Sequence, residues 1–187
     1  MVQGISTSVY GLGILLALAL DAQPKPFPPI DRIVGSDSYV EQPSIGLATN
    51  VREWNAVWQR HKGITPIGNG ATGNFPTAEV PPSVDFDHNV VLVIFGGLAP
   101  AAGYDVFEST VAKKTVTIRL KPISLNLNGG PAKASFRANP YSFYVYPRTK
   151  YPFVVQMPAA DQNGNLTWRT VGKVGGTAGR NPSHPSR

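Results

Sequence analysis

The chain predicts an α+β fold that leans mainly β, with antiparallel sheets of short strands and one amphipathic helix packed on a face. Nineteen glycines and 18 prolines among 187 residues interrupt nearly every long segment, which favours short strands and ordered turns over a helical bundle. Only one stretch has helical periodicity, and several apolar runs are bounded by turn residues. These observations together indicate one domain with a substantial hydrophobic core.

The helix is expected in the stretch NVREWNAVWQRH, residues 50–61. Asn50 is a suitable N-cap, Glu53 stands three residues later as in a capping box, and Gly63 ends the helix. One apolar stripe at helical spacing runs along it: Trp54, Val57, Trp58 and His61. The tryptophans are therefore predicted to anchor the helix to the core.

Strands are expected from runs with period-two alternation or continuous apolar character. Residues 89–95 are almost entirely apolar, which predicts a strand buried on both faces. Asn163-Gly164 predicts a hairpin turn, while residues 64–82 and 124–135 have the composition of long loops. The predicted strands cover residues 32–36, 44–49, 89–95, 104–111, 115–123, 141–147, 152–157 and 166–171.

The chain divides into four parts. Residues 1–22 are predicted to be an export signal or an N-terminal apolar segment, because the apolar run 9–20 suits a signal sequence and is too short to span a bilayer. Residues 23–31 form a Pro-rich linker, residues 32–171 a single β-rich domain, and residues 172–187 a flexible basic tail. The expected location is therefore periplasmic, cell-surface or extracellular, without a transmembrane helix.

Composition excludes several kinds of chemistry. The chain has no cysteine, so disulfides, thiolate metal sites and cysteine nucleophiles are excluded. The net charge of +6 is spread thinly, so no nucleic-acid partner is predicted. No G-x-S-x-G, P-loop or G-x-G-x-x-G motif is present. We therefore expect a non-enzymatic protein with no cofactor and no metal.

Two polar clusters have alternative interpretations. Asp85, Asp87 and His88 could ligate a metal or act in acid–base chemistry, but a capped polar turn before a strand is the favoured interpretation. The repeat around Gly164 in DQNGN has a faint likeness to a calcium loop, yet the glutamate that completes such a loop is missing. A hairpin turn is favoured there.

The segment NPYSFYVYPRTKYPF, residues 139–153, is rich in aromatic residues. Tyr144 and Tyr146 share one face of the expected strand. Tyrosine is enriched at protein interfaces, so this face is a candidate interaction surface. A second packed layer of the core is the equally favoured alternative.

The segment GGLAPAAGYDV, residues 96–106, connects two expected strands with unusually small residues. Small residues let another backbone approach closely, and Pro100 restricts the loop before binding. We therefore predict a partner-binding site made by this loop and the tyrosine face: Leu98, Ala99, Pro100, Ala101, Ala102, Gly103, Tyr104, Tyr144 and Tyr146.

Four motifs in order resemble the PrcB family, the C-terminal domain of a subunit of a bacterial surface protease complex. They are EWNAVWQRH, then VDF at residues 84–86, then VVLVIFGGLAPAAGYDV, and then NPYSFYVYP. The resemblance spans residues 49–156. Ala101 and Ala102 stand where the family favours Thr-Gly, so a hydroxyl is missing from the loop.

The resemblance implies a non-enzymatic domain that binds another protein, with a protease as the named precedent, or copies of itself. One alternative is a structural subunit of a surface or virion-like assembly that uses its N-terminal arm and C-terminal tail. A second alternative is a protease inhibitor that inserts the Gly/Pro loop as a wedge.

Overall fold

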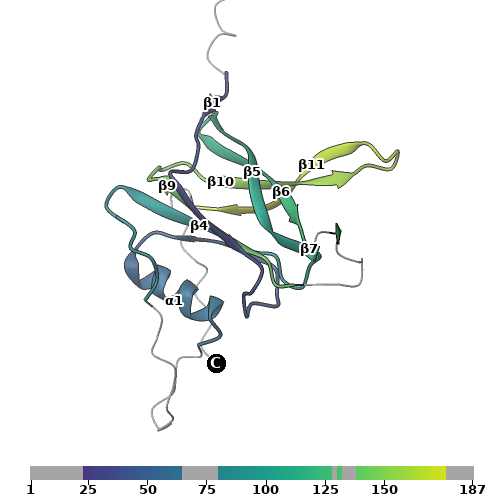
Figure 1. Ribbon diagram of the computed structural model, residues 1–187. Helices are drawn as coiled ribbons and strands as arrows, with labels where there is room; N and C mark the ends of the chain where they lie inside the picture. Colours follow the sequence, from purple (N-terminus) through teal and green to yellow (C-terminus); the bar gives the residue numbers. More distant parts are fainter. Residues whose placement is uncertain (1–22, 65–79, 128–129, 132–137, 176–187) are drawn as a thin grey trace, which may run out of the picture.

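Two sheets face each other, and the one helix of the described residues covers the outer side of one of them (Figure 1). The computed structural model describes residues 23–64, 80–127, 130–131 and 138–175. The α+β, mainly β prediction is confirmed. The predictions made for residues 1–22, for most of the loop 64–82 and for residues 176–187 lie outside the described residues.

The four-stranded sheet is antiparallel throughout and has the order β2-β9-β4-β3. Its strands are β2 (Asp31–Gly35), β3 (Ser44–Ala48), β4 (Asn89–Phe95) and β9 (Tyr141–Pro147). Strand β4 is central and its apolar residues are buried on both faces. This position explains why its sequence is continuously apolar.

The five-stranded sheet has the order β1-β5-β6-β10-β11. Its strands are β1 (Lys25–Pro26), β5 (Ala101–Ala112), β6 (Thr115–Ser124), β10 (Phe153–Ala160) and β11 (Leu166–Val174). The β6–β10 pair is parallel and the others are antiparallel. Two short strands, β7 (Asn126–Leu127) and β8 (Gly130–Pro131), pair with each other.

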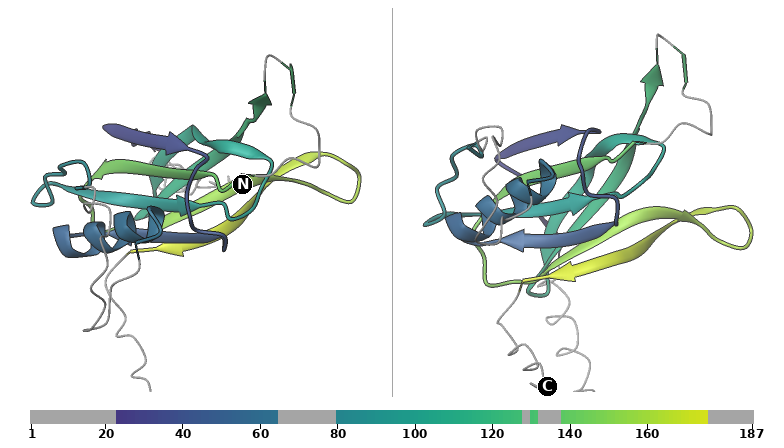
Figure 2. Two further views of the ribbon diagram at one scale, coloured as in Figure 1. Left: turned by 60° about the horizontal axis from the view of Figure 1, so that its bottom comes forward. Right: turned by 90° about the horizontal axis from the view of Figure 1, so that it is seen from below.

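Helix α1 (Val51–His61) packs on the outer face of the four-stranded sheet (Figure 2). The Trp54 ring meets Phe143 edge-on at 5.1 Å, and Trp54 and Trp58 are buried as predicted. Asn50 Oδ1 accepts the Glu53 N–H at 2.9 Å. The Glu53 carboxylate reaches back one residue further than predicted, to the Thr49 N–H at 2.7 Å. The cap therefore satisfies backbone donors at the helix start.

The core between the sheets is built from alternate residues of the facing strands. Its buried members include three tyrosines, a residue type whose hydroxyl usually finds a hydrogen-bond partner when it is buried. The buried residues are Val90, Leu92, Ile94, Tyr104, Val116, Ile118, Leu120, Tyr144, Tyr146, Phe153 and Val155.

The Pro-rich segment belongs to the sandwich, whereas the sequence predicted a linker outside the domain. Lys25 pairs with Val111 of β5, and the Phe27 ring stacks on Tyr146 at 5.7 Å with 2° between the planes. The Ile30 N–H then bonds to the Val145 carbonyl at 2.8 Å. The segment thus crosses from the five-stranded sheet to the four-stranded sheet, because apolar burial outweighs the local preference for a free polyproline linker.

Strands β10 and β11 continue past the rest of their sheet as a two-stranded ribbon (Figure 2). Asp161 closes its tip by accepting the Asn163 and Asn165 N–H groups, both at 2.8 Å, which confirms the hairpin turn. Strand β11 runs to Val174, beyond the predicted domain boundary at residue 171. Leu166 near the tip is 81% exposed.

Candidate functional site

The predicted binding loop is shorter than its sequence suggested. Strand β5 begins at Ala101 rather than at Tyr104, so the connection after β4 covers only residues 96–100. Ala101, Gly103 and Tyr104 are buried strand residues. Their burial corrects the prediction that they face a partner.

The glycines of this segment approach other parts of the same chain. Gly97 has φ +63°, and a Cβ there would lie 2.6 Å from the Glu41 carbonyl. Gly103 has φ +132°, and a Cβ there would collide with Val34 of β2. A side chain at Gly96 would overlap the Tyr104 ring. The close backbone approach predicted for a partner is therefore made within the fold.

Two residues remain at the surface of the loop, Leu98 and Pro100. Leu98 is 56% exposed. Between them, Ala99 is bridged to Ala138 by a reciprocal pair of backbone hydrogen bonds, each 2.9 Å. Ala102 follows and is half-buried. We call residues 98–100 the loop apex.

Tyr144 and Tyr146 point into the space between the sheets and have no exposed surface. The Tyr144 hydroxyl donates to the Tyr104 carbonyl. Burial raises the pKa of Tyr144 to about 12 and raises the pKa of Tyr146 as well. The tyrosine face is thus the second packed layer, and the prediction of an interaction surface at these two residues is corrected.

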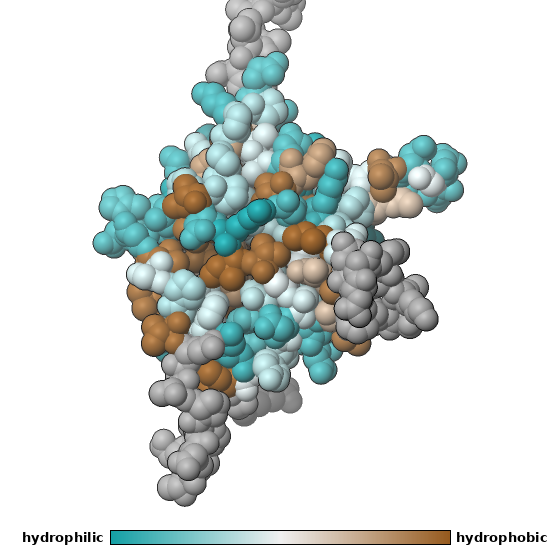
Figure 3. All heavy atoms as spheres, in the orientation of Figure 1, coloured by the Kyte–Doolittle hydropathy of each residue, from teal (hydrophilic) through white to brown (hydrophobic). Residues whose placement is uncertain are grey.

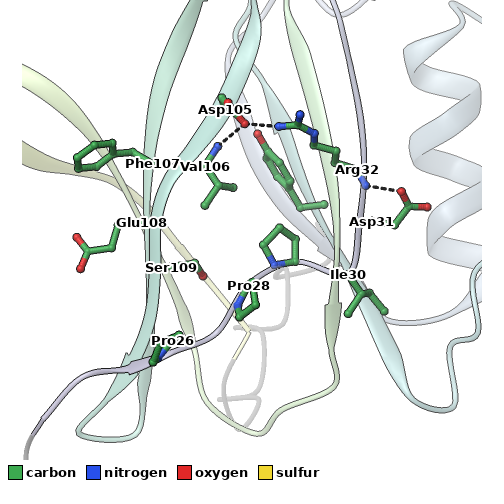
Figure 4. A pocket seen from close by; sticks show the side chains of 12 residues that line it. Pro26, Pro28, Ile30, Asp31, Arg32, Asp105, Val106, Phe107, Glu108 and Ser109 are labelled. Carbon is green, nitrogen blue, oxygen red and sulfur yellow. Dashed lines mark hydrogen bonds and ion pairs between the residues drawn. The ribbon is translucent and has the colours of Figure 1, made fainter.

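A groove of about 580 Å³ opens between strands β2 and β5. The Pro-rich segment forms one wall, and the buried Tyr144 of β9 lies beneath the groove. Arg32 of β2 and Asp105 of β5 reach toward each other across it and form an ion pair (Figure 4). Asp105 also accepts the Val106 N–H at 3.0 Å. Sequence reasoning missed this groove because its walls come from segments more than 70 residues apart, with no shared motif.

An aromatic stack lies on the outer face of the five-stranded sheet. Phe107 occupies a β-bulge of β5 and stacks on Trp168 of β11, with 5.4 Å between centroids and 18° between planes. The Lys121 ammonium lies 3.6 Å from the Phe107 centroid, and the Arg119 guanidinium 5.4 Å from the Trp168 centroid. The stack holds the β10–β11 ribbon against β5. The bulge that aims Phe107 outward has no local sequence signal.

The Asp85 cluster forms a turn. The Asp85 carboxylate accepts the Asp87 N–H at 3.0 Å and contacts His88 Nδ1 at 2.8 Å. The hydrogen bond between the two side chains lowers the pKa of Asp85 and raises the pKa of His88. Within the described part of the chain, no group of three or more His, Cys, Asp or Glu residues could hold a metal ion.

Comparison of the chain with protein-family models, with curated proteins and with solved structures found no match. Among the helices of the described residues, none is long and apolar enough to cross a membrane. The resemblance to the PrcB family therefore stays a prediction that rests on the four sequence motifs alone.

Proposed function

We propose that this chain is an exported protein-binding domain that docks another protein through the loop apex at residues 98–100. The observation that carries this proposal is an exposed leucine and an exposed proline on a backbone that is anchored on both sides. Gly97 and Gly103 pack against the fold, and Ala99 is hydrogen-bonded to Ala138.

An anchored apex favours binding, because the loop loses little conformational freedom when a partner binds. Leu98 supplies apolar area, and Pro100 fixes its own φ. The missing hydroxyl at Ala101 and Ala102 weighs little against this site, because Ala101 is buried in the strand. The four motifs that resemble the PrcB family favour a protease complex as the partner.

The test uses two matched leucine variants of the full chain. Leu98→Asp removes the apolar apex, while Leu166→Asp makes the same change at another exposed leucine. A photo-crosslinking residue is placed at position 98 or at position 166, and the adducts formed in intact cells are identified by mass spectrometry.

We expect one defined protein adduct from position 98 that is absent from position 166. Binding of that protein, once purified, should weaken at least tenfold with Leu98→Asp and change little with Leu166→Asp, because removing a central apolar contact costs about 1–2 kcal/mol or more. The same adducts from both positions, or none from position 98, would contradict the proposal.

A second candidate, a structural subunit that binds copies of itself, is favoured by the β10–β11 ribbon. β11 is an edge strand of its sheet, and Leu166 and Val171 are exposed along it. An edge of this kind is a template for pairing with another chain.

Light scattering after size-exclusion chromatography tests this second candidate. Self-assembly predicts a dimer or larger particle that Leu166→Asp dissociates and Leu98→Asp leaves intact. A monomer at high protein concentration would rule the candidate out, without bearing on the loop apex.

A further inference from the structure

Apolar surface is broken up on the face of the molecule that Figure 3 shows, where hydrophilic residues separate the apolar ones. An interaction surface on such a molecule depends on single side chains that the fold holds in place. Among the phenylalanine, tyrosine and tryptophan residues of the described chain, Tyr39 and Phe107 alone are exposed, by 72% and 55%. Phe107 stacks on Trp168, whereas the Tyr39 ring has no aromatic partner among these residues.

Tyr39 lies in the connection between β2 and β3, residues 36–43. Its two neighbours in the sequence, Ser38 and Val40, are buried, with 3% and 5% of their surface exposed. Alternating exposed and buried residues indicate an extended chain that packs on the fold with one side. We call residues 37–41, which follow this alternation, the Tyr39 segment.

Backbone hydrogen bonds hold the Tyr39 segment in place. The Tyr39 N–H donates to the His61 carbonyl at the end of helix α1, at 2.9 Å. The Ser38 N–H donates to the Asn139 carbonyl at 3.2 Å. The ring itself lies against Gly63, because a Cβ added there would be 2.7 Å from the Tyr39 Cγ. A partner would therefore meet a ring on an ordered backbone, and little conformational freedom is lost on binding.

Residues 138–139 join the Tyr39 segment to the loop apex. The Asn139 carbonyl accepts the Ser38 N–H on one side. On the other side, Ala138 exchanges two backbone hydrogen bonds with Ala99 of the apex. Hydrogen-bonded neighbouring segments are about 4.8 Å apart, so the backbones of the Tyr39 segment and the apex are roughly 10 Å apart. Both lie at the end of the four-stranded sheet where β2 and β4 end and β9 begins.

Charges of both signs surround Tyr39. Asp37 and Glu41 belong to the Tyr39 segment, while Arg60 and Lys62 lie at the end of helix α1 that the segment contacts. These two carboxylates and two cations balance, so net charge does not attract a nucleic acid or an anionic membrane here. The apolar area of a tyrosine ring and a leucine side chain is what this end offers, and such area fits a protein partner.

We propose that Tyr39 is a second anchor for the protein that binds the loop apex, and that its ring enters an apolar recess on that protein. The inference rests on the proposed function, because it assigns both contacts to one partner. Tyrosine brings a large contact area at a low cost in side-chain freedom. The partner is then a folded protein with two apolar recesses roughly 10 Å apart, one for the Tyr39 ring and one for Leu98.

The test places a photo-crosslinking residue at position 39, 98 or 166 of the full chain in intact cells, and mass spectrometry identifies the adducts. Binding of the captured protein, once purified, is then measured for Tyr39→Ala and Tyr39→Phe. Leu166→Ala is the control, because it removes another exposed apolar side chain from a different part of the fold. The melting temperature of each variant is measured alongside.

We expect positions 39 and 98 to capture the same protein and position 166 not to capture it. Tyr39→Ala should weaken binding at least tenfold, while Tyr39→Phe and Leu166→Ala change it little, because the ring supplies the contact. The melting temperature of Tyr39→Ala should stay within about 2 °C of that of the unchanged protein, since the side chain is exposed.

The outcomes separate this inference from the proposed function. A defined adduct from position 98 without the same adduct from position 39 would overturn the role of Tyr39 and leave the loop apex standing. Unchanged binding of Tyr39→Ala, equal loss in Tyr39→Phe, or loss of binding together with a clearly lower melting temperature would overturn it as well. No defined adduct from position 98 would contradict the proposed function, and this inference with it.

Discussion

At the scale of single residues, the glycines of the segment 96–103 decide how the sheets meet. Gly103 of β5 lies against β2, where the Val34 side chain occupies the space that a Cβ at position 103 would need. The small residues thus mark an internal contact, although the same pattern in the sequence also suits a partner's approach.

Gly103→Ala should destabilise the protein by at least about 2 kcal/mol. The new methyl group would collide with Val34, and φ +132° is a strained conformation for alanine. Gly46→Ala is the matched control, because a Cβ there meets Val93 at an ordinary 3.8 Å. Chemical denaturation of both variants gives the comparison, and equal stability of the two would refute this account of the segment.

At the scale of elements, the helix cap and the Pro-rich segment each stabilise the sandwich by a contact that can be removed singly. Asn50→Ala deletes the acceptor of the Glu53 N–H. It should lower the free energy of unfolding by about 1 kcal/mol. Asn55→Ala, at an exposed position within the same helix, should be neutral or slightly stabilising. A cap variant as stable as the Asn55 variant would contradict the assigned role.

Phe27→Ala tests whether the Pro-rich segment is part of the folded unit. The ring packs between Tyr146 and Phe153, so its loss should cost about 2–3 kcal/mol for a partly buried phenylalanine. Ile30→Ala, in the same segment but 59% exposed, should cost far less. Thermal melts of the two variants would show equal stability if the segment were only a linker.

At the scale of the whole molecule, buried tyrosines link stability to alkaline pH. Burial raises the pKa of Tyr104, Tyr144 and Tyr146 above the ordinary value of 10.0, and that of Tyr144 to about 12. The folded state therefore favours the neutral phenol. Its stabilising contribution is complete below pH 10 and is lost as the pH rises through about 12.

A pH titration that follows tyrosinate absorbance together with circular dichroism checks this expectation. Ionisation of the buried tyrosines should coincide with cooperative loss of the β-sheet signal. If every tyrosine ionised near pH 10 while the fold stayed intact, the conclusion that these hydroxyls are buried would be wrong.

Local patterns in the sequence were enough to predict the helix, most of the strands and the mainly β class. The Trp54–Trp58 stripe, the apolar run of β4 and the Asn-Gly turn each report a local period or a local backbone preference. Each of those signals depends on residues that are only a few positions apart, so it can be recognised without knowledge of the fold. The same patterns placed a connection after β4, but they extended it to residue 103, whereas β5 begins at Ala101.

Only the tertiary structure decided which of the candidate residues reach the surface. Alternation shows that Tyr144 and Tyr146 share a face, but a second sheet must be present before that face becomes core. The parallel β6–β10 pair and the groove spanned by the Arg32–Asp105 ion pair both join segments distant in sequence. Their position depends on strand order and register. Local preferences specify neither the order nor the register, because the free energy that selects both comes from burying one sheet against the other.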